Sequence, residues 1–383
     1  MNILCVYVDG GKGHYIPAKA VQEQLEALGH NAVMVDFFEF LGLRLAGRIN
    51  KFVWRRLLEH PGYEMRFSKR NDQNTDEIRL VSRLLRVIRM RRFRKMVERY
   101  RPDMIFTTHP YPGYFLAELA HHGRIDVPVT YYATDVFSVP MSAICNHLWA
   151  MYVSTQEGYE SALERGQRKD TLKLCPFPLQ ASCRESRRMS KKEARRLLGL
   201  DEDVFTLQVN FGGEGVGATD LLAALKDIDT PMQVLVIGGI EDRMKTELER
   251  IVRTLPDNID VRIVGFVANV NDYLLSCDII AGRSGINTLV EAFYLRRPFL
   301  ITELVYTVIA SADYVEKYKV GWNASHDVAR QLEIIRTYSS NPALLDEMDR
   351  NFDLIPMEYD ASALAKMVVD DAQSYRTKTR THG

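Results

Sequence analysis

Apolar residues recur along this chain in short runs that alternate with longer stretches of helical periodicity. The first run, residues 3–8, is made of side chains that favour strands, and a break containing three glycines follows at residues 9–13. Apolar positions 18, 21, 25 and 28 then share one helical face, and residues 31–38 form a second strand-like run. A strand, a crossover helix and a second strand make a βαβ unit, so the pattern predicts a parallel sheet.

The same alternation continues through the rest of the chain. Further buried strands are predicted at residues 103–108, 127–135, 148–154, 204–210, 233–237, 260–264, 279–281 and 298–302. Pro176 and Pro178 mark a hinge, because proline interrupts regular structure and restricts the residue before it. Beyond the hinge, Ser190 and Glu193 have the spacing of a capping box at the start of a helix.

The length of 383 residues exceeds what one hydrophobic core usually organises. We therefore expect two α/β domains, an N-terminal one at residues 1–178 and a C-terminal one at residues 179–361. A C-terminal helix at about residues 362–383 is expected to pack back on the first domain. With 46% hydrophobic and 26% charged residues, the composition is typical of a folded globular protein.

The five cysteines are scattered and show no paired spacing, so neither a disulfide framework nor a zinc site is predicted. The first residues lack the charged start and length of a signal peptide, and no window has about 18 consecutive apolar residues. We therefore expect a protein of a reducing compartment that neither crosses a membrane nor is exported by a signal peptide.

The formal net charge is zero, but residues 41–101 hold 18 Lys and Arg against 6 Asp and Glu. Within residues 41–58 apolar side chains alternate with arginines at helical spacing, and residues 83–95 repeat the trend. This pattern favours contact with an anionic membrane surface. The residues predicted to make it are Arg44, Arg48, Trp54, Arg55 and Arg56. An ordinary amphipathic helix packed on the sheet is the alternative; nucleic-acid binding is disfavoured, because no nucleic-acid-binding module accompanies the charge.

A glycine-rich turn, residues 212–217, lies between a predicted strand and a predicted helix. Backbone N–H groups in such a turn, together with the helix N-terminus, can hold phosphate oxygens. Gly212, Gly213, Glu214 and Gly215 are therefore candidates for binding the diphosphate of a nucleotide. The alternative is a tight turn without a ligand.

A second group of polar residues follows the strand predicted at residues 279–281. Arg283 is suited to a diphosphate, Ser284 and Thr288 supply hydroxyls, and Glu291, one helical turn beyond Asn287, is suited to accept hydrogen bonds from ribose. The alternative is that Ser284 caps the helix and that Glu291 is solvated.

Three polar residues follow strands of the N-terminal domain, where ligands of parallel sheets bind. His14, His109 and Asp135 are expected to converge at one sheet edge, with His14 as a general base or a group that orients the acceptor. A cap or loop histidine is the alternative. The turn is neither a dinucleotide fingerprint nor a Walker A loop. Metal binding at residues 201–203 or 227–229 is disfavoured, because these carboxylates lie in helix ends or loops.

Taken together, these motifs resemble the monogalactosyldiacylglycerol synthase and processive diacylglycerol glucosyltransferase group, related to the peptidoglycan GlcNAc transferase of glycosyltransferase family 28. The resemblance covers most of the chain. The matching segments are residues 10–14, 102–110, 133–135 with Trp149 and 153–155, 212–217 in a GGEGxG form, 264–267 and 283–291.

The resemblance implies a GT-B fold, in which two Rossmann-like parallel-sheet domains face each other across a cleft. The acceptor would bind the N-terminal domain, with Gly11, Gly13 and His109 in contact with it, and the UDP-sugar the C-terminal one. By the same analogy uracil meets Phe266 and Val267. Ribose meets Glu291, and the diphosphate lies between the glycine turn and the helix that carries Ser284, Gly285, Asn287 and Thr288. Transfer would be inverting and independent of metal and of any cofactor, with His14 or Asp135 as base and Arg283 stabilising the departing UDP.

Two features depart from that group. Lys12 stands within the first glycine turn, where another small residue is usual. After the strand that follows Glu291 the group tends to carry glutamine or glutamate with an asparagine, which read sugar hydroxyls, whereas residues 302–311 of this chain are TELVYTVIAS. The sequence therefore does not predict which sugar is transferred. The leading hypothesis is transfer of a hexose from a UDP-sugar to a lipid such as diacylglycerol by a cytoplasmic protein, peripheral on the inner face of the cell membrane. The alternatives are a UDP-sugar epimerase and a non-catalytic nucleotide-sugar or lipid-binding protein.

Overall fold

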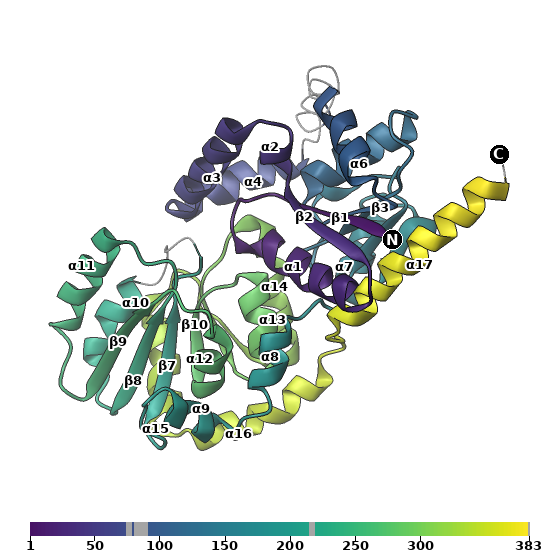
Figure 1. Cartoon of the computed structure of the whole chain (residues 1–383). Helices are drawn as coiled ribbons and strands as arrows, with labels where there is room; N and C mark the ends of the chain where they lie inside the picture. Colours follow the sequence, from purple (N-terminus) through teal and green to yellow (C-terminus); the bar gives the residue numbers. More distant parts are fainter. Residues whose placement is uncertain (74–78, 80–90, 214–218, 382–383) are drawn as a thin grey trace. The chain divides into compact units, whose positions relative to one another are not determined.

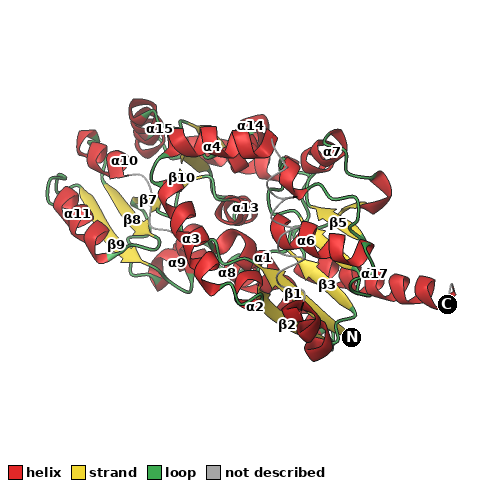
Figure 2. Ribbon diagram, turned by 90° about the horizontal axis from the view of Figure 1, so that it is seen from above, coloured by secondary structure: helices red, strands yellow, loops and turns green. Residues whose placement is uncertain are grey.

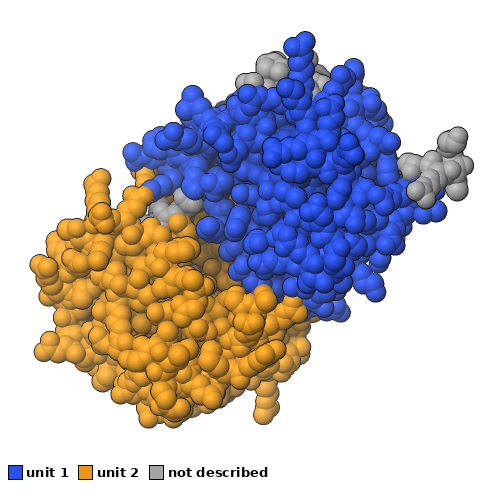
Figure 3. Space-filling view, in the orientation of Figure 1, with its two compact units in different colours: residues 1–57, 62–180, 357–383 blue, residues 58–61, 181–356 orange. Residues whose placement is uncertain are grey.

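The computed structural model describes residues 1–383 except 74–78, 80–90, 214–218 and 382–383. The chain divides into two compact units, coloured separately in Figure 3. Unit 1 consists of residues 1–57, 62–180 and 357–383, and unit 2 of residues 58–61 and 181–356. Each unit contains one sheet, and both sheets have six parallel strands.

The sheet of unit 1 has the order β2-β1-β3-β4-β5-β6. Its strands are β1 (Asn2–Tyr7), β2 (Asn31–Asp36), β3 (Met104–Thr107), β4 (Val129–Tyr132), β5 (Ala150–Val153) and β6 (Leu172–Leu174). The helices labelled in this unit are α1 (Lys12–Ala27), α2 (Phe37–Phe40), α3 (Arg44–Leu58), α4 (Pro61–Gln73), α6 (Pro110–His121), α7 (Gln156–Glu164) and α17 (Ala361–Thr381), and residues 91–100 are also helical. The labels can be followed in Figure 1.

The strands of unit 1 are continuous apolar runs because helices cover both faces of the sheet. Alternate residues such as Val6 and Ile105 pack in one core with Phe115 of α6 and Phe93 of the helix at residues 91–100. On the opposite face α1 packs against α17. The C-terminal helix is also held by a hydrogen bond of 2.5 Å from the Tyr152 hydroxyl to the carboxylate of Asp371.

The sheet of unit 2 has the order β12-β11-β10-β7-β8-β9. Its strands are β7 (Phe205–Asn210), β8 (Met232–Ile237), β9 (Ile259–Gly265), β10 (Ile279–Arg283), β11 (Phe299–Glu303) and β12 (Gly321–Asn323). Its helices are α8 (Ala181–Ser186), α9 (Lys191–Leu197), α10 (Thr219–Ala224), α11 (Asp242–Val252), α12 (Val270–Ser276), α13 (Ile286–Tyr294), α14 (Ala310–Tyr318), α15 (Val328–Ser340) and α16 (Ala343–Asp349). Figure 2 shows these strands with helices on both sides.

The prediction of two parallel α/β sheets is confirmed, and so is the capping box. The Ser190 hydroxyl accepts from the backbone N–H of Glu193, whose carboxylate accepts from the backbone N–H of Ser190. Two strands were not predicted, β6 and β12, and each is only three residues long. Within the described residues no helix is long and apolar enough to span a membrane.

The strand order positions the functional loops. In each sheet the direction of strand addition reverses at one point, between β1 and β3 in unit 1 and between β7 and β10 in unit 2. At such a point the loops that follow the two neighbouring strands diverge toward opposite faces. They leave a crevice at the carboxyl edge, where ligands of open α/β sheets bind. The residues predicted for catalysis and for binding of the acceptor and the nucleotide sugar lie at or after the ends of these four strands and of β4 and β9, whereas those predicted for membrane binding lie on α3.

Candidate active site

In unit 1 the switch point is marked by His14, in the first turn of α1. Its Nδ1 lies 2.6 Å from the Thr108 carbonyl oxygen, just after β3, and 3.1 Å from the Thr134 hydroxyl, just after β4. The Thr108 hydroxyl in turn donates to the His14 carbonyl over 2.7 Å. Because a carbonyl oxygen only accepts, Nδ1 carries the proton and Nε2 keeps a lone pair. His14 is thus oriented as a proton acceptor.

His109 lies beside His14 but has the opposite tautomer. The two ring centroids are 4.3 Å apart. His109 caps α6, and its Nδ1 accepts from the backbone N–H of Tyr111 over 3.1 Å. Nδ1 therefore has no proton, and Nε2–H is a donor. The pair presents one acceptor nitrogen and one donor nitrogen at the carboxyl edge of the sheet.

Both imidazoles of this pair are neutral near pH 7. Burial lowers the pKa of His14 to about 4, with the hydrogen bond to Thr108 opposing the shift. Burial lowers the pKa of His109 well below its usual value, and the neighbouring His14 lowers it further. A base of such low pKa takes a proton only as the reacting hydroxyl becomes acidic in the transition state.

Asp135 follows β4 and is half-buried. Burial raises its pKa to about 7, and the carboxylate of Asp72 adds to the shift. Asp72 itself is held by Arg165 at 2.7 Å and by the backbone N–H of Met141 at 2.6 Å. Within the described part of the chain, the contact from this loop to His14 comes from Thr134 rather than from Asp135. The loops of His14, His109 and Asp135 therefore share one edge, with Thr134 joining two of them.

In unit 2 the backbone of the loop after β7 lies close to that of the loop after β8. Gly212 has a φ of +62°, and its N–H donates to the Asn210 side chain over 2.7 Å. A Cβ on Gly238 would lie 2.7 Å from the Gly212 carbonyl oxygen, so the loop after β8 also requires glycine there. Gly213 is exposed at the edge. Glu214 and Gly215, with residues 216–218, lie outside the described residues.

Two polar side chains of the α13 region, Ser284 and Glu291, are buried. Ser284 is fully buried, and its hydroxyl has no hydrogen bond among the described residues. The N-cap of α13 is Gly285, without a side-chain cap, so the alternative that Ser284 caps this helix is wrong. Glu291 is only 5% exposed, and burial raises its pKa to about 8, so it is not a solvated surface residue. Buried polar groups in proteins usually have a hydrogen-bond partner, so the unpaired hydroxyl of Ser284 at a sheet switch point is suited to a ligand.

Arg283 is paired with a residue that the sequence analysis did not single out. Its Nη2 lies 2.6 Å from the carboxylate of Glu303, at the end of β11, and both side chains are largely buried. The Nε of Arg283 has no hydrogen bond partner among the described residues. Glu303 therefore offsets part of the positive charge and fixes the guanidinium. No sequence signal identifies this pair, because β10 and β11 meet only in the folded sheet.

The other residues predicted to bind the nucleotide sugar lie at the same edge of the sheet. Phe266 directly follows β9 and is 69% exposed, and Val267 beside it is half-buried. Asn287 is buried and Thr288 half-buried in the first turn of α13. Two strands, β7 and β8, separate β9 from β10, so Phe266 lies farther along the edge than Ser284.

The basic segment of unit 1 exposes apolar side chains as well as charge. Arg44, Arg48 and Arg56 are exposed on α3, whereas Trp54 and Arg55 are half-buried. The exposed apolar stripe consists of Leu45, Ile49, Phe52 and Val53, which are 70%, 54%, 61% and 44% exposed. Their spacing of four, seven and eight residues places them on one helical face. Sequence reasoning chose Trp54 and missed this stripe, because periodicity does not tell which face is covered.

Among the described residues no group of three or more His, Cys, Asp or Glu side chains is arranged to hold a metal ion. All five cysteines are buried and free of disulfides.

Residues 14–179 match the family model of monogalactosyldiacylglycerol (MGDG) synthase. The chain is 28% identical over 221 residues to a probable MGDG synthase from Glycine max. That match covers 55% of this chain and 41% of the relative, so the chain spans well under two thirds of the plant protein. It is also 22% identical over 387 residues to a processive diacylglycerol beta-glucosyltransferase from Bacillus licheniformis, covering 99% of this chain and 97% of the relative.

Solved structures show the same fold. MurG from Acinetobacter baumannii matches with a TM-score of 0.62 at 12% identity, covering 96% of this chain and 99% of that one. The Anabaena protein HepE, solved with UDP and glucose, matches with a TM-score of 0.56 at 13% identity over 100% of both chains. UDP-GlcNAc 2-epimerase from Neisseria meningitidis, bound to UDP-GlcNAc, matches with a TM-score of 0.62 at 11% identity, covering 98% of this chain and 100% of that one.

Proposed function

We propose that this chain, which has the GT-B fold and is related to the MGDG synthases and the processive diacylglycerol glucosyltransferases, is a hexosyltransferase. It transfers a hexose from a UDP-sugar to the hydroxyl of a lipid acceptor such as diacylglycerol. Transfer inverts the anomeric configuration and uses no metal ion and no cofactor. It takes place at the cytoplasmic face of a membrane with anionic lipids.

The observation that carries this proposal is a pair of buried polar groups at the switch point of unit 2, a hydroxyl unpaired among the described residues and a carboxyl whose pKa burial raises. The Ser284 hydroxyl lies just before α13, and the Glu291 carboxyl lies on its second turn. Vicinal hydroxyls of a ribose match a carboxyl group, and a phosphate oxygen matches a serine hydroxyl. Binding of UDP would satisfy both groups, whose burial is otherwise unfavourable.

The diphosphate is assigned to the groups around this pair. The N-terminus of α13 presents backbone N–H groups and a partial positive charge. After the neighbouring strand β7, Gly212 and Gly213 have no side chains and let a phosphate come close to their backbone. Arg283 contributes its free Nε–H while Glu303 holds its Nη2. These fixed donors stabilise the charge on departing UDP, which is the role that a metal ion has in other transferases.

The acceptor reaction uses the histidine pair of unit 1. The acceptor oxygen forms a bond to the anomeric carbon while the bond from that carbon to the phosphate oxygen breaks, with its electron pair leaving on UDP. The proton of the lipid hydroxyl passes to Nε2 of His14. The Nε2–H of His109 donates a hydrogen bond to an oxygen of the lipid acceptor. A single displacement of this kind inverts the anomeric centre.

The membrane part of the proposal rests on α3. Its exposed stripe of Leu45, Ile49, Phe52 and Val53 is flanked by Arg44, Arg48 and Arg56, an arrangement suited to the interface of an anionic leaflet. A lipid acceptor stays in the bilayer, so the transferase has to work at its surface.

The proposal is tested with a panel of UDP-sugars, each incubated with and without vesicles containing diacylglycerol. UDP release and the mass of the lipid product are measured. We expect UDP release that depends on diacylglycerol and a product heavier by one hexosyl unit. Absence of a glycolipid product with every UDP-sugar would contradict the proposal.

A UDP-sugar epimerase is the second candidate, favoured by the likeness to UDP-GlcNAc 2-epimerase. Such an enzyme would convert one UDP-sugar to another without vesicles, which the same panel detects by chromatography of the nucleotide sugars. A non-catalytic binding protein would gain thermal stability from UDP but turn over no sugar in the panel.

A further inference from the structure

The helix α3 has a second face that the proposed membrane contact does not use. Residues 47, 50, 51 and 54 fall on it, and at about 100° per residue this face lies opposite the exposed stripe. Gly47 brings α3 close to α2, because a Cβ at this glycine would lie 3.0 Å from the Cβ of Phe38. A Cβ on Gly10, in the turn after β1, would lie 3.5 Å from the Nδ2 of Asn50. This face of α3 therefore packs on unit 1 and reaches the turn that precedes His14.

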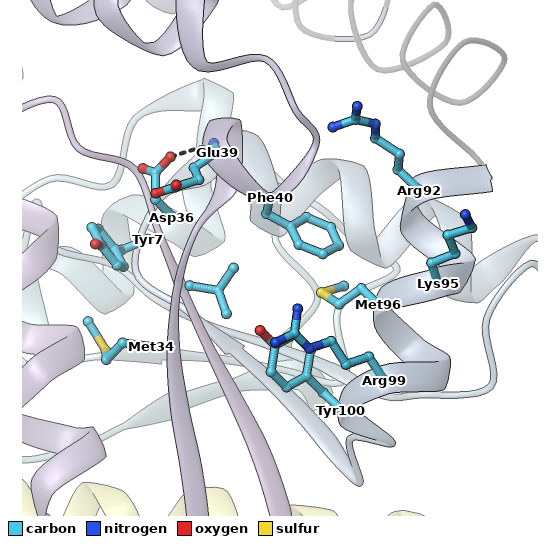
Figure 4. Close-up of a pocket in the computed structure, with 11 residues that line it drawn as sticks. Tyr7, Met34, Asp36, Glu39, Phe40, Arg92, Lys95, Met96, Arg99 and Tyr100 are labelled. Carbon is cyan, nitrogen blue, oxygen red and sulfur yellow. Dashed lines mark hydrogen bonds between the residues drawn. The ribbon is translucent and has the colours of Figure 1, made fainter.

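Lys51, on the same face, forms an ion pair with the first residue of that turn. Its Nζ lies 3.1 and 3.3 Å from the two carboxylate oxygens of Asp9. The backbone N–H of Asp9 donates to the Asp36 carboxylate over 2.8 Å, and Asp36 also accepts from the backbone N–H of Glu39 over 2.7 Å (Figure 4). Asp9 thus joins the turn to the end of β2 through its backbone and to α3 through its side chain.

The turn of residues 9–13 leads directly into the helix that carries His14. Gly11 has a φ of +130° at the N-cap of α1, and no side chain of the described residues caps this helix start. Within the turn, the backbone N–H of Gly10 donates to the Val8 carbonyl over 2.9 Å. The contacts of Asp9 and Gly10 with neighbouring elements therefore help to fix the turn, and with it the start of α1.

We propose that Lys51 is a positioning residue for the acceptor reaction. Through its ion pair with Asp9, α3 fixes the offset between the lipid surface, which its other face contacts, and the first turn of α1. The inference rests on the proposed function, in which the acceptor stays in the bilayer while its hydroxyl reaches Nε2 of His14. The offset decides whether these two atoms meet, and a misplacement of about 1 Å can cost about a hundredfold in rate.

The exposure of the pair predicts where it acts most strongly. The side chains of Lys51 and Asp9 are 47% and 60% exposed, so water and salt weaken their attraction when the chain is free in solution. A membrane against α3 displaces part of that water and lowers the effective dielectric constant, which strengthens the attraction. The ion pair therefore holds the turn most firmly when α3 lies on lipid.

The kinetic test uses saturating vesicles that contain diacylglycerol, so that differences in membrane binding do not enter kcat. Lys51→Gln and Asp9→Asn each remove one charge of the pair, and the double variant Asp9→Lys with Lys51→Asp exchanges the charges. We expect each single variant to lower kcat about tenfold while KM for the UDP-sugar changes less than about twofold. The double variant should recover at least about half of the wild-type kcat, which a merely structural role of either side chain would not give.

Lys19→Gln is the matched control for the loss of an ammonium group from a partly exposed ion pair. Lys19 pairs with Glu23 at 3.4 Å, and both residues belong to α1. This pair joins two turns of one helix rather than α3 and the turn after β1. The variant should therefore keep the wild-type kcat and KM.

Hydrogen exchange of the full chain, followed by mass spectrometry, tests the link without any turnover. A peptide spanning residues 5–14 contains the hydrogen-bonded N–H groups of Asp9 and Gly10. Lys51→Gln lies outside this peptide, so its intrinsic exchange rates are unchanged, and we expect at least about threefold faster exchange than in the wild type. If the wild type forms no glycolipid, the proposed function fails, and the exchange measurement still decides whether the pair holds the turn.

Four results would overturn the inference. Wild-type kcat in Lys51→Gln would show that the ion pair does not position His14. A loss in Lys51→Gln that Asp9→Asn does not share would show that the ammonium group acts without Asp9. No recovery in the double variant would show that the two charges act separately. Equal exchange in the wild type and Lys51→Gln would show that other contacts hold the turn.

Discussion

At the scale of single residues, the hydrogen bonds of His14 and His109 determine which nitrogen is free. The Thr108 carbonyl accepts a hydrogen bond from Nδ1 of His14, so that nitrogen carries the proton. The Tyr111 backbone N–H donates to Nδ1 of His109, so that nitrogen has no proton. The sequence predicted both histidines because each follows a strand that ends at the same edge. Their tautomers, and the roles of Thr108, Thr134 and Glu303, depend on contacts between residues far apart in the chain. Local patterns carry no information about such contacts.

The pH dependence of turnover distinguishes His14 from Asp135 as the base. If His14 accepts the proton, its pKa of about 4 means that kcat/KM should be nearly constant between about pH 5 and pH 6.5. If Asp135 accepts it, its pKa of about 7 means that kcat/KM should rise about tenfold per pH unit over that range. We expect the flat profile, measured as initial rates of UDP release.

The variant His14→Asn provides the matched test of this assignment. The asparagine amide can still donate to the Thr108 carbonyl, but no nitrogen replaces Nε2. We expect kcat to fall by about 10²–10⁴-fold while KM for the UDP-sugar changes little. Thr134→Val, which removes only the longer contact to His14, is the control and should keep most activity. Full turnover in His14→Asn would exclude His14 as the base.

Glu291 makes a second prediction at this scale. Its raised pKa of about 8 means that the carboxyl is mostly protonated at pH 7, and glutamine resembles that state in shape and in hydrogen bonding. We expect Glu291→Ala to weaken UDP binding about tenfold and Glu291→Gln to weaken it less than about threefold, measured by calorimetry at pH 7. Bound UDP is anionic and favours the protonated carboxyl, so wild-type affinity should fall above pH 8, whereas that of Glu291→Gln should not. Identical affinities in all three proteins would remove Glu291 from the nucleotide site.

At the scale of elements, every strand that was predicted has four or more residues. β6 and β12 have three residues each, too few to show a period, and their place at the sheet edge comes from pairing with β5 and β11. For α3 the element could be predicted, but its buried face could not. Its periodicity was visible in the sequence, but which of its residues are covered depends on the rest of the unit.

The exposed stripe of α3 is predicted to bind lipid. Ile49→Ser with Phe52→Ser removes two large apolar side chains that are more than half exposed, so the fold should be kept while the apolar area available to the interface falls. We expect at least about tenfold weaker binding to anionic vesicles in a sedimentation assay. Leu174→Ser with Leu197→Ser, two exposed leucines outside α3, is the control and should bind as the wild type does. Equal binding by the two double variants would show that α3 is not the membrane contact.

At the scale of the whole molecule, the fold class could be predicted because both halves repeat one pattern of strand, loop and helix. The C-terminal helix was expected to pack on the first domain, but the contacts that join residues 357–383 to residues 1–57 and 62–180 are harder to derive. The return of the chain is made by contacts such as that of Tyr152 with Asp371, which are 219 positions apart. No local pattern specifies a contact of that separation.

Buried titratable groups of the two units bias stability in opposite directions. His14 has a lowered pKa of about 4, so between pH 4 and its unfolded value of 6.5 the unfolded chain binds more protons, and stability falls as the pH is lowered. Glu291 has a raised pKa of about 8, so between its unfolded value of 4.5 and pH 8 the folded chain binds more protons, and stability falls as the pH is raised. The two contributions oppose each other between about pH 4.5 and pH 6.5, so the melting temperature should be highest there.

Calorimetric melting of wild type, His14→Asn and Glu291→Gln from pH 4.5 to pH 8 separates these contributions. Neither substituted side chain titrates, so His14→Asn should lose less stability than the wild type on the acid side. Glu291→Gln should lose less than the wild type on the alkaline side. Each effect should amount to about 1–2 kcal/mol in the unfolding free energy, below the full linkage value because relaxation and partial exposure reduce it. If both variants kept the wild-type slopes, the burial of these two groups would not control the pH response, and the environments assigned to the base and to the nucleotide site would be wrong together.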